Sequence, residues 1–189
     1  WFHRLDAFFI GIALLIQFLI SLWYRSQLPD WLPWNYGFLV ILVACQGLLG
    51  GLTVVQLLPS FVVIAHLFLA LTLVASMSGI SQQLISANGS LGPYWWRLMS
   101  FTSLLAVMFQ SILGSRMATL WAAQRCLAES QACKWLSFHR FSAMPVSIFI
   151  FGFIFLSLAV KGWTRRQWPY LMVVLTLLIS QISLGFLSI

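Results

Sequence analysis

Six long apolar stretches dominate this chain of 189 residues. They run over Leu5 to Tyr24, Tyr36 to Leu58, Phe61 to Ile80, Leu98 to Ala122, Phe141 to Val160 and Trp168 to Ile189. Each is close to the roughly 20 residues that an α-helix needs to cross a bilayer, and each is too long for a strand. Because backbone polar groups in lipid must be satisfied within the chain, helices are favoured. The stretches therefore predict an all-α integral membrane protein with six visible transmembrane helices.

The composition excludes the main soluble classes. Charged residues make up 7% of the chain, whereas an ordinary soluble domain carries roughly 25%. With 3 Cys, a disulfide-dense secreted scaffold is excluded too. The net charge of +7 is scattered between the apolar stretches, and the densest basic cluster is the short run from Lys161 to Arg166. We therefore expect a lipid bilayer around the protein and no nucleic-acid partner.

Two motifs recur along the chain and indicate an internal duplication. The motifs are His-Arg, at His3-Arg4 and His139-Arg140, and Gln-x-x-Leu-Gly, which begins at Gln46, Gln110 and Gln181. Gln46 follows the first His-Arg pair at almost the same spacing as Gln181 follows the second. An even number of spans separates these equivalent points, so the two halves insert in the same direction. The repeat predicts eight spans in two parallel-repeated four-helix bundles, with the first and last span outside this chain.

The repeat also predicts the domain organisation. Residues 1–80 hold the last three helices of the N-terminal half, 81–97 form a cytoplasmic linker, and 98–189 hold the first three helices of the C-terminal half. With Arg116 and the arginines of the His-Arg motifs set aside, most Lys and Arg residues lie on the linker side, which marks that side as cytoplasmic. Cys126 and Cys133 fall on the opposite face, where an oxidising compartment would permit a disulfide.

The three histidines share one local pattern, His-x-x-x-Ala, at His3, His66 and His139. The alternation of spans places all three on the same membrane side. Since positions i and i+4 share a helix face, the alanine leaves room for a flat macrocycle beside the imidazole. Imidazole is a common axial ligand of haem iron, and two histidines on facing helices can hold one haem. Arg4 and Arg140 are then placed to pair with haem propionates.

Other interpretations of these motifs stay open at this point. An intramembrane histidine can serve helix packing or proton transfer. Zinc is disfavoured because no Cys, Asp or Glu lies at ligand spacing from the histidines. The Gln-x-x-Leu-Gly motif can be a seam of small residues between helices, or it can let the backbone approach a haem closely.

Taken together, these residues resemble the haem A synthase family of integral membrane enzymes. The resemblance rests on His3-Arg4, on the segment from Gln46 to Val54, on Leu58-Pro59, on His66-Leu67, on two cysteines before His139-Arg140, and on Gln181 to Gly185. It covers nearly the whole chain, which corresponds to the second through seventh of eight helices. Paired outer-loop cysteines such as Cys126 and Cys133 are typical of bacterial-type members.

The resemblance implies an oxidoreductase that converts the methyl group of haem O to the formyl group of haem A for cytochrome oxidase assembly. It implies that His3 and His66, with Arg4, hold the substrate haem O. It further implies that His139, with Arg140, holds a haem b cofactor, whose second histidine lies beyond the end of this chain. The metal expected at all three histidines is haem iron. The family's functional acid precedes the first His-Arg motif, so the catalytic residue is unknown here.

The resemblance also implies partners and a location. We expect haem O synthase and an unidentified electron acceptor as partners, in a bacterial plasma membrane, with the histidines towards the outer face; homo-oligomerisation is left open. Cys126 and Cys133 are expected to form a disulfide, either structural or redox-active. Because it holds only one complete histidine pair, the chain is not expected to catalyse the reaction alone. The alternative function is a non-enzymatic bis-histidine cytochrome b that carries electrons.

Overall fold

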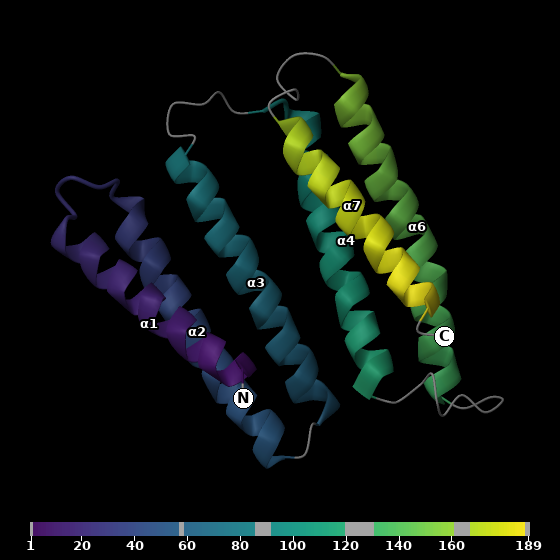
Figure 1. Ribbon diagram of the computed structural model, residues 1–189, viewed down its shortest axis with the longest axis horizontal. Coiled ribbons are helices and arrows are strands. Elements are labelled where there is room, and N and C mark those ends of the chain that lie inside the picture. The colour runs from purple at the N-terminus through teal and green to yellow at the C-terminus, as the bar shows by residue number, and fades with distance from the viewer. Residues whose placement is uncertain (1, 57–58, 86–91, 120–130, 161–166, 188–189) are drawn as a thin grey trace. The chain divides into compact units, whose positions relative to one another are not determined.

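The computed structural model describes residues 2–56, 59–85, 92–119, 131–160 and 167–187, and it is helical throughout these segments apart from short turns (Figure 1). The helices are α1 (Phe2–Trp23), α2 (Trp31–Val55), α3 (Ser60–Ile85), α4 (Tyr94–Thr119), α6 (Gln131–Ala159) and α7 (Trp168–Leu187). All six are long and apolar enough to cross a membrane. The predicted all-α membrane fold with six visible spans is therefore confirmed, while the total of eight spans stays a prediction.

Several helices extend beyond the apolar stretches that predict them. α6 begins at Gln131, well before Phe141, so Lys134 and His139 are already helical. α3 ends at Ile85 and α4 begins at Tyr94, so helical residues occupy both ends of the expected 81–97 linker. The physical reason is that only the hydrocarbon layer demands apolar side chains, whereas a helix can continue through the headgroup region with polar ones.

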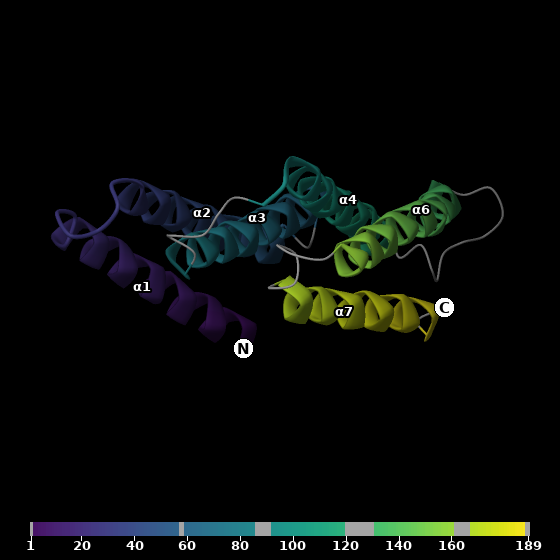
Figure 2. The same cartoon turned by 90° about the horizontal axis from the view of Figure 1, so that it is seen from above.

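The first compact unit comprises Trp1–Gly89. Its consecutive helices run antiparallel, and α2 packs against both α1 and α3 (Figures 1 and 2). Its buried core consists of Leu14, Leu32, Leu39, Leu42, Leu73 and Ile80. Leu32 and Leu39 on α2 are a heptad apart, as are Leu73 and Ile80 on α3. This spacing is that of a coiled-coil seam, which keeps one face of each helix against its neighbour.

The second compact unit comprises Ser90–Ile189. α4 and α6 form an antiparallel hairpin, and α7 packs against α6. The core is formed by Ile150, Phe153 and Ile154 of α6 with Leu171 of α7. The indole of Trp96 on α4 lies against Phe153, with 5.6 Å between the ring centroids. This aromatic contact ties the hairpin together near the beginning of α4.

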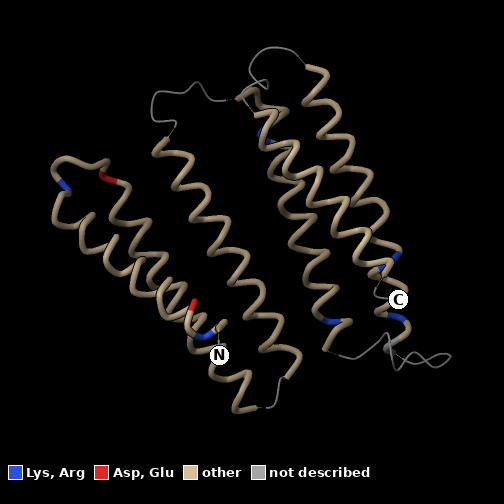
Figure 3. The backbone as a smooth tube through the Cα atoms, in the orientation of Figure 1, with Lys and Arg blue, Asp and Glu red and all other residues tan. Residues whose placement is uncertain are grey.

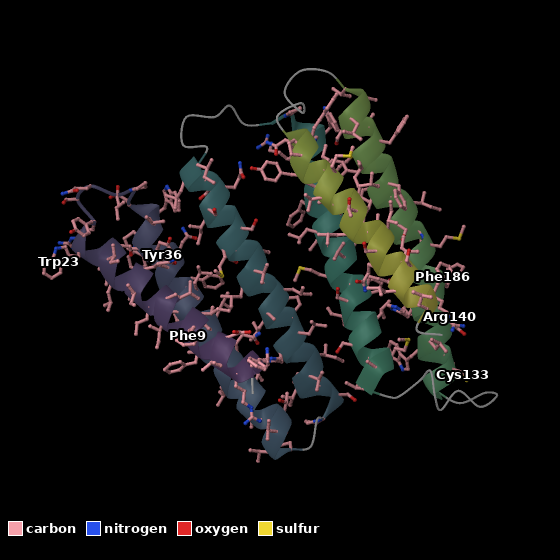
Figure 4. The ribbon with its side chains drawn as sticks, in the orientation of Figure 1. Phe9, Trp23, Tyr36, Cys133, Arg140 and Phe186 are labelled. Atoms are coloured by element: carbon pink, nitrogen blue, oxygen red, sulfur yellow. The ribbon has the colours of Figure 1, made fainter. Side chains whose placement is uncertain are left out.

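The distribution of charge and of exposed apolar groups fits a lipid environment. The charged residues in the described segments lie towards helix ends and connections (Figure 3). Large apolar side chains project outward along the helices, among them Phe9 and Phe186, which are 58% and 77% exposed (Figure 4). Monomeric soluble proteins rarely expose apolar surface on this scale. The outward faces are therefore suited to acyl chains or to further helices.

We expect Leu39→Ala to destabilise the first unit by about 2 kcal/mol, the lower end of the range for large-to-small core substitutions. Leu39 is 1% exposed. Truncating it removes packing contacts, although lipid reduces the hydrophobic part of the loss. The control is Ile41→Ala on the same helix, because Ile41 is 64% exposed. Thermal unfolding in detergent measures both, and equal melting temperatures for the two variants would contradict the assigned core.

Candidate functional site

The imidazole of His139 packs against a glycine of the preceding helix. A Cβ placed on Gly114 of α4 would lie 3.2 Å from Cε1, 3.7 Å from Nδ1 and 3.8 Å from Nε2 of His139. A contact of 3.2 Å is tighter than nine in ten real Cβ contacts, so with a larger residue here the ring would have to shift by a few tenths of an ångström. Gly114 therefore creates the space in which the His139 ring lies between α4 and α6.

Gln110, one helical turn before Gly114 on α4, holds the same ring through a hydrogen-bond network. The side-chain nitrogen Nε2 of Gln110 lies 3.1 Å from Nδ1 of His139 and donates to the backbone oxygen of His139 at 2.9 Å. The hydroxyl of Ser142 lies 2.8 Å from Oε1 of Gln110 and 3.1 Å from the same backbone oxygen. Because Gln110 and Gly114 share a face of α4, the motif supplies both the space and the polar partner for one imidazole.

His66 lies in a similar position in the first unit. A Cβ placed on Gly50 of α2 would lie 3.4 Å from Cε1 and 3.9 Å from Nδ1 of His66 on α3. Gln46 precedes Gly50 by one turn, as Gln110 precedes Gly114. Oε1 of Gln46 and Nδ1 of His66 are both buried, and neither has a hydrogen-bond partner within the described segments.

These contacts clarify the role of the Gln-x-x-Leu-Gly motif. In both antiparallel hairpins, α2–α3 and α4–α6, the motif glycine faces the imidazole of the next helix. The seam of small residues and the histidine site are therefore the same feature. A Cβ on Gly51 or on Gly47 would meet nothing within 4 Å, so Gly50 is the glycine of this segment that contacts a ring. An alignment of whole halves does not reveal this pairing of a motif glycine with a histidine. The signal that reveals it is the order along the chain: in each half, a Gln-x-x-Leu-Gly motif on one helix is followed by a histidine on the next helix.

His3 and Arg4 occupy the first turn of α1, and both are exposed. Since consecutive helices of this unit run antiparallel, the beginnings of α1 and α3 lie at the same end of the unit (Figure 1). His3 and His66 thus lie towards one end, on two helices that both pack against α2. Within the described segments no hydrogen bond joins His3 or Arg4 to another side chain, which leaves both able to meet a ligand.

The other predicted positions lie along α6 and its surroundings. Arg140 is exposed, beside His139 (Figure 4). Arg116, near the end of α4, lies over the ring of Trp135 at 5.6 Å from the centroid, a cation–π contact between the two helices. Cys133 is not a free thiol, but Cys126 falls outside the described residues, so the predicted disulfide stays a prediction.

The donor set restricts what these histidines could bind. No three His, Cys, Asp or Glu side chains come together within the described segments to enclose a metal ion. Each histidine instead presents a single imidazole on a largely apolar helix. One imidazole per face is what an axial ligand of a planar iron macrocycle requires, because the macrocycle supplies the remaining four nitrogens. The residues present therefore fit a haem better than a bare metal ion.

Comparison with known proteins gives one match. The model of the COX15-CtaA family, described as cytochrome oxidase assembly protein, matches residues 1–189. Comparisons with curated proteins and with solved structures give no match.

We expect Gly114→Ala to lose the stability that a helical Gly→Ala change normally gains. Alanine is more favourable than glycine in a helix by about 1 kcal/mol, but here its Cβ would meet the His139 ring. Gly152→Ala on α6 is the matched control, since a Cβ there meets nothing within 4 Å. Thermal unfolding in detergent should give a higher melting temperature for Gly152→Ala than for Gly114→Ala. The reverse order would show that the ring does not lie on Gly114.

Proposed function

Because the chain belongs to the COX15-CtaA family of cytochrome oxidase assembly proteins, we propose that it acts as a haem A synthase. In this proposal it oxidises the methyl substituent of haem O to the formyl group of haem A in the membrane. His3 and His66 hold haem O, with Arg4 at its propionates. His139 holds haem b, with Arg140 in the corresponding role.

The observation that carries the proposal is the repeated contact between a motif glycine and a histidine ring. A Cβ placed on Gly50 would lie 3.4 Å from Cε1 of His66, and a Cβ placed on Gly114 would lie 3.2 Å from Cε1 of His139, in two separate units. The same glycine, glutamine and histidine recur in both hairpins, which supports a duplicated cofactor site. The family match supplies the context in which such a cofactor is haem.

Each side chain has a definite task in this proposal. His66 binds haem O and His139 binds haem b, and the glycines opposite them set how far each ring can move. Arg4 and Arg140 are exposed cations next to histidines, suited to charge-assisted hydrogen bonds with carboxylates. The apolar helices exclude water from the centre of the site. When bound, the haems supply the redox chemistry of the reaction.

The remaining components are proposed on the same basis. The partners are haem O synthase, which supplies the substrate, and an electron acceptor. The protein lies in a plasma membrane with its histidines towards the outer face, and a disulfide joins Cys126 to Cys133. A non-enzymatic cytochrome b remains the second candidate, because two similarly built histidine positions would also serve an electron carrier.

The proposal is tested by expressing the protein in cells that make haem O and identifying the extracted haems by mass. We expect haem A to form, and His66→Ala to reduce it to background because the substrate loses its axial ligand. Phe61→Ala is the matched control on α3, since Phe61 is 80% exposed. Bound haem b with haem O left unconverted in the unmodified protein would favour the electron carrier instead.

A second expectation separates the two haem sites. His139→Ala should remove haem b from the purified protein, because the proposed ligand of that haem is lost. His66→Ala should leave haem b in place, since His66 belongs to the other unit. The absorption spectrum of the reduced protein and the extracted haem content measure both effects. Equal loss of haem b in the two variants would contradict the assignment of one haem to each half.

A further inference from the structure

Arg116 is a cation near the His139 site that has no role in the proposed function. It lies in the last turn of α4, and its guanidinium lies over the ring of Trp135 on α6, 5.6 Å from the centroid. Trp135 precedes His139 by four residues, so the two rings share a face of α6. The guanidinium is therefore placed beside the histidine face, one helical turn, or about 6 Å along the axis, from His139 towards the beginning of α6.

The hydrogen-bonding groups of this guanidinium are available to a ligand. The tryptophan ring covers one face of the guanidinium, whereas its five N–H groups point outward in the plane. Among the described residues, no hydrogen bond or ion pair engages these groups. The side chain is also half-buried. A cation that is held by an aromatic ring and partly withdrawn from water is suited to bind a carboxylate through two parallel hydrogen bonds.

The second unit supplies few carboxylates for its cations. Lys134 and Arg140 lie at the same end of the α4–α6 hairpin as Arg116, because the two helices run antiparallel (Figure 1). Of the three acidic residues in the chain, Glu129 is the one in this unit, and it falls outside the described residues. The histidine end of the hairpin is therefore rich in positive charge and suited to an anionic ligand.

The placement of Arg116 matches the shape of a haem. Haem b is a flat molecule with two propionates on one edge, and because carboxylates are costly to bury in lipid, this edge faces the membrane surface. Arg116 lies on the side of His139 that is nearer the end of the hairpin, where the carboxylate edge would be. The proposed function assigns one cation, Arg140, to these two carboxylates. A second cation on the facing helix would complete the set.

We propose that Arg116 is a second propionate-binding residue of the haem b site, held in position by Trp135 and acting together with Arg140. The inference rests on the proposed function for the presence of haem b at His139. Arg116 can also stabilise the fold, through the dipole of α4 and through its contact with Trp135. Those structural roles do not depend on whether the ligand carries carboxylates, so the charge of the ligand separates the two possibilities.

The test titrates the detergent-purified protein with haem b and, separately, with haem b dimethyl ester, in which both propionates are uncharged. The Soret absorption measures binding. Arg116→Gln should weaken the binding of haem b about tenfold, the loss expected for one hydrogen bond to a charged group, and leave the affinity for the ester within about twofold. Arg116→Lys keeps the charge without the planar fork, so its affinity for haem b should lie between those of the other two proteins.

Arg97→Gln is the matched control on α4. Arg97 also lies beside an aromatic ring, 5.9 Å from the centroid of Tyr94, but at the opposite end of the helix. Both affinities should therefore stay unchanged in this variant.

Two results for Arg116→Gln would overturn the inference and leave the proposed function intact. One is equal weakening of haem b and of its ester, because Arg116 would then serve the fold or pair with another anion, such as a lipid phosphate or Glu129. The other is unchanged affinity for haem b. Failure of the unmodified protein to bind haem b would overturn both the inference and the proposed haem b site.

Discussion

The contact between an imidazole ring and a glycine of the preceding helix is the interaction on which the rest of this structure depends. In lipid, helices gain little from burying apolar groups against one another, so close packing and interhelical polar contacts decide which faces meet. Gly114 lets the His139 ring approach α4, and Gln110 gives that ring a hydrogen-bonding neighbour. One short motif therefore brings the two helices of the hairpin together and places a histidine between them.

The two hairpins use this contact with different surroundings. In the second unit, Ser142 and a backbone oxygen complete the network around Gln110. In the first unit, Leu69 stands at the position equivalent to Ser142, and Oε1 of Gln46 and Nδ1 of His66 are buried without a partner among the described residues. A polar atom in a low-dielectric interior is costly unless it is paired. In the proposed function, this difference would distinguish a site for a substrate haem from a site for a resident haem.

The spans could be predicted from the sequence because hydrophobicity over about 20 residues is a local property. The helix ends could not be predicted, since nothing in the apolar pattern shows that α6 continues back to Gln131. The histidines and arginines were identified by their repeats, but their surroundings depend on contacts between helices. The approach of His66 to Gly50, and the bond from Ser142 to Gln110, join residues that no periodicity links. The family, in contrast, was recognisable from the motifs and is confirmed by the match over residues 1–189.

The central claim, that Gly114 keeps open the place of the imidazole proposed to ligate haem b, can be measured directly. The haems extracted from the Gly50→Ala and Gly114→Ala proteins, made in cells that produce haem O, are identified and quantified by mass. The account predicts that Gly114→Ala loses haem b, because the added Cβ would lie 3.2 Å from Cε1 of His139, closer than nine in ten real Cβ contacts. It predicts that Gly50→Ala keeps both haems, because a Cβ there would lie 3.4 Å from Cε1 of His66, an ordinary van der Waals contact. Full retention of both haems in both variants, or the same loss in each, would contradict it.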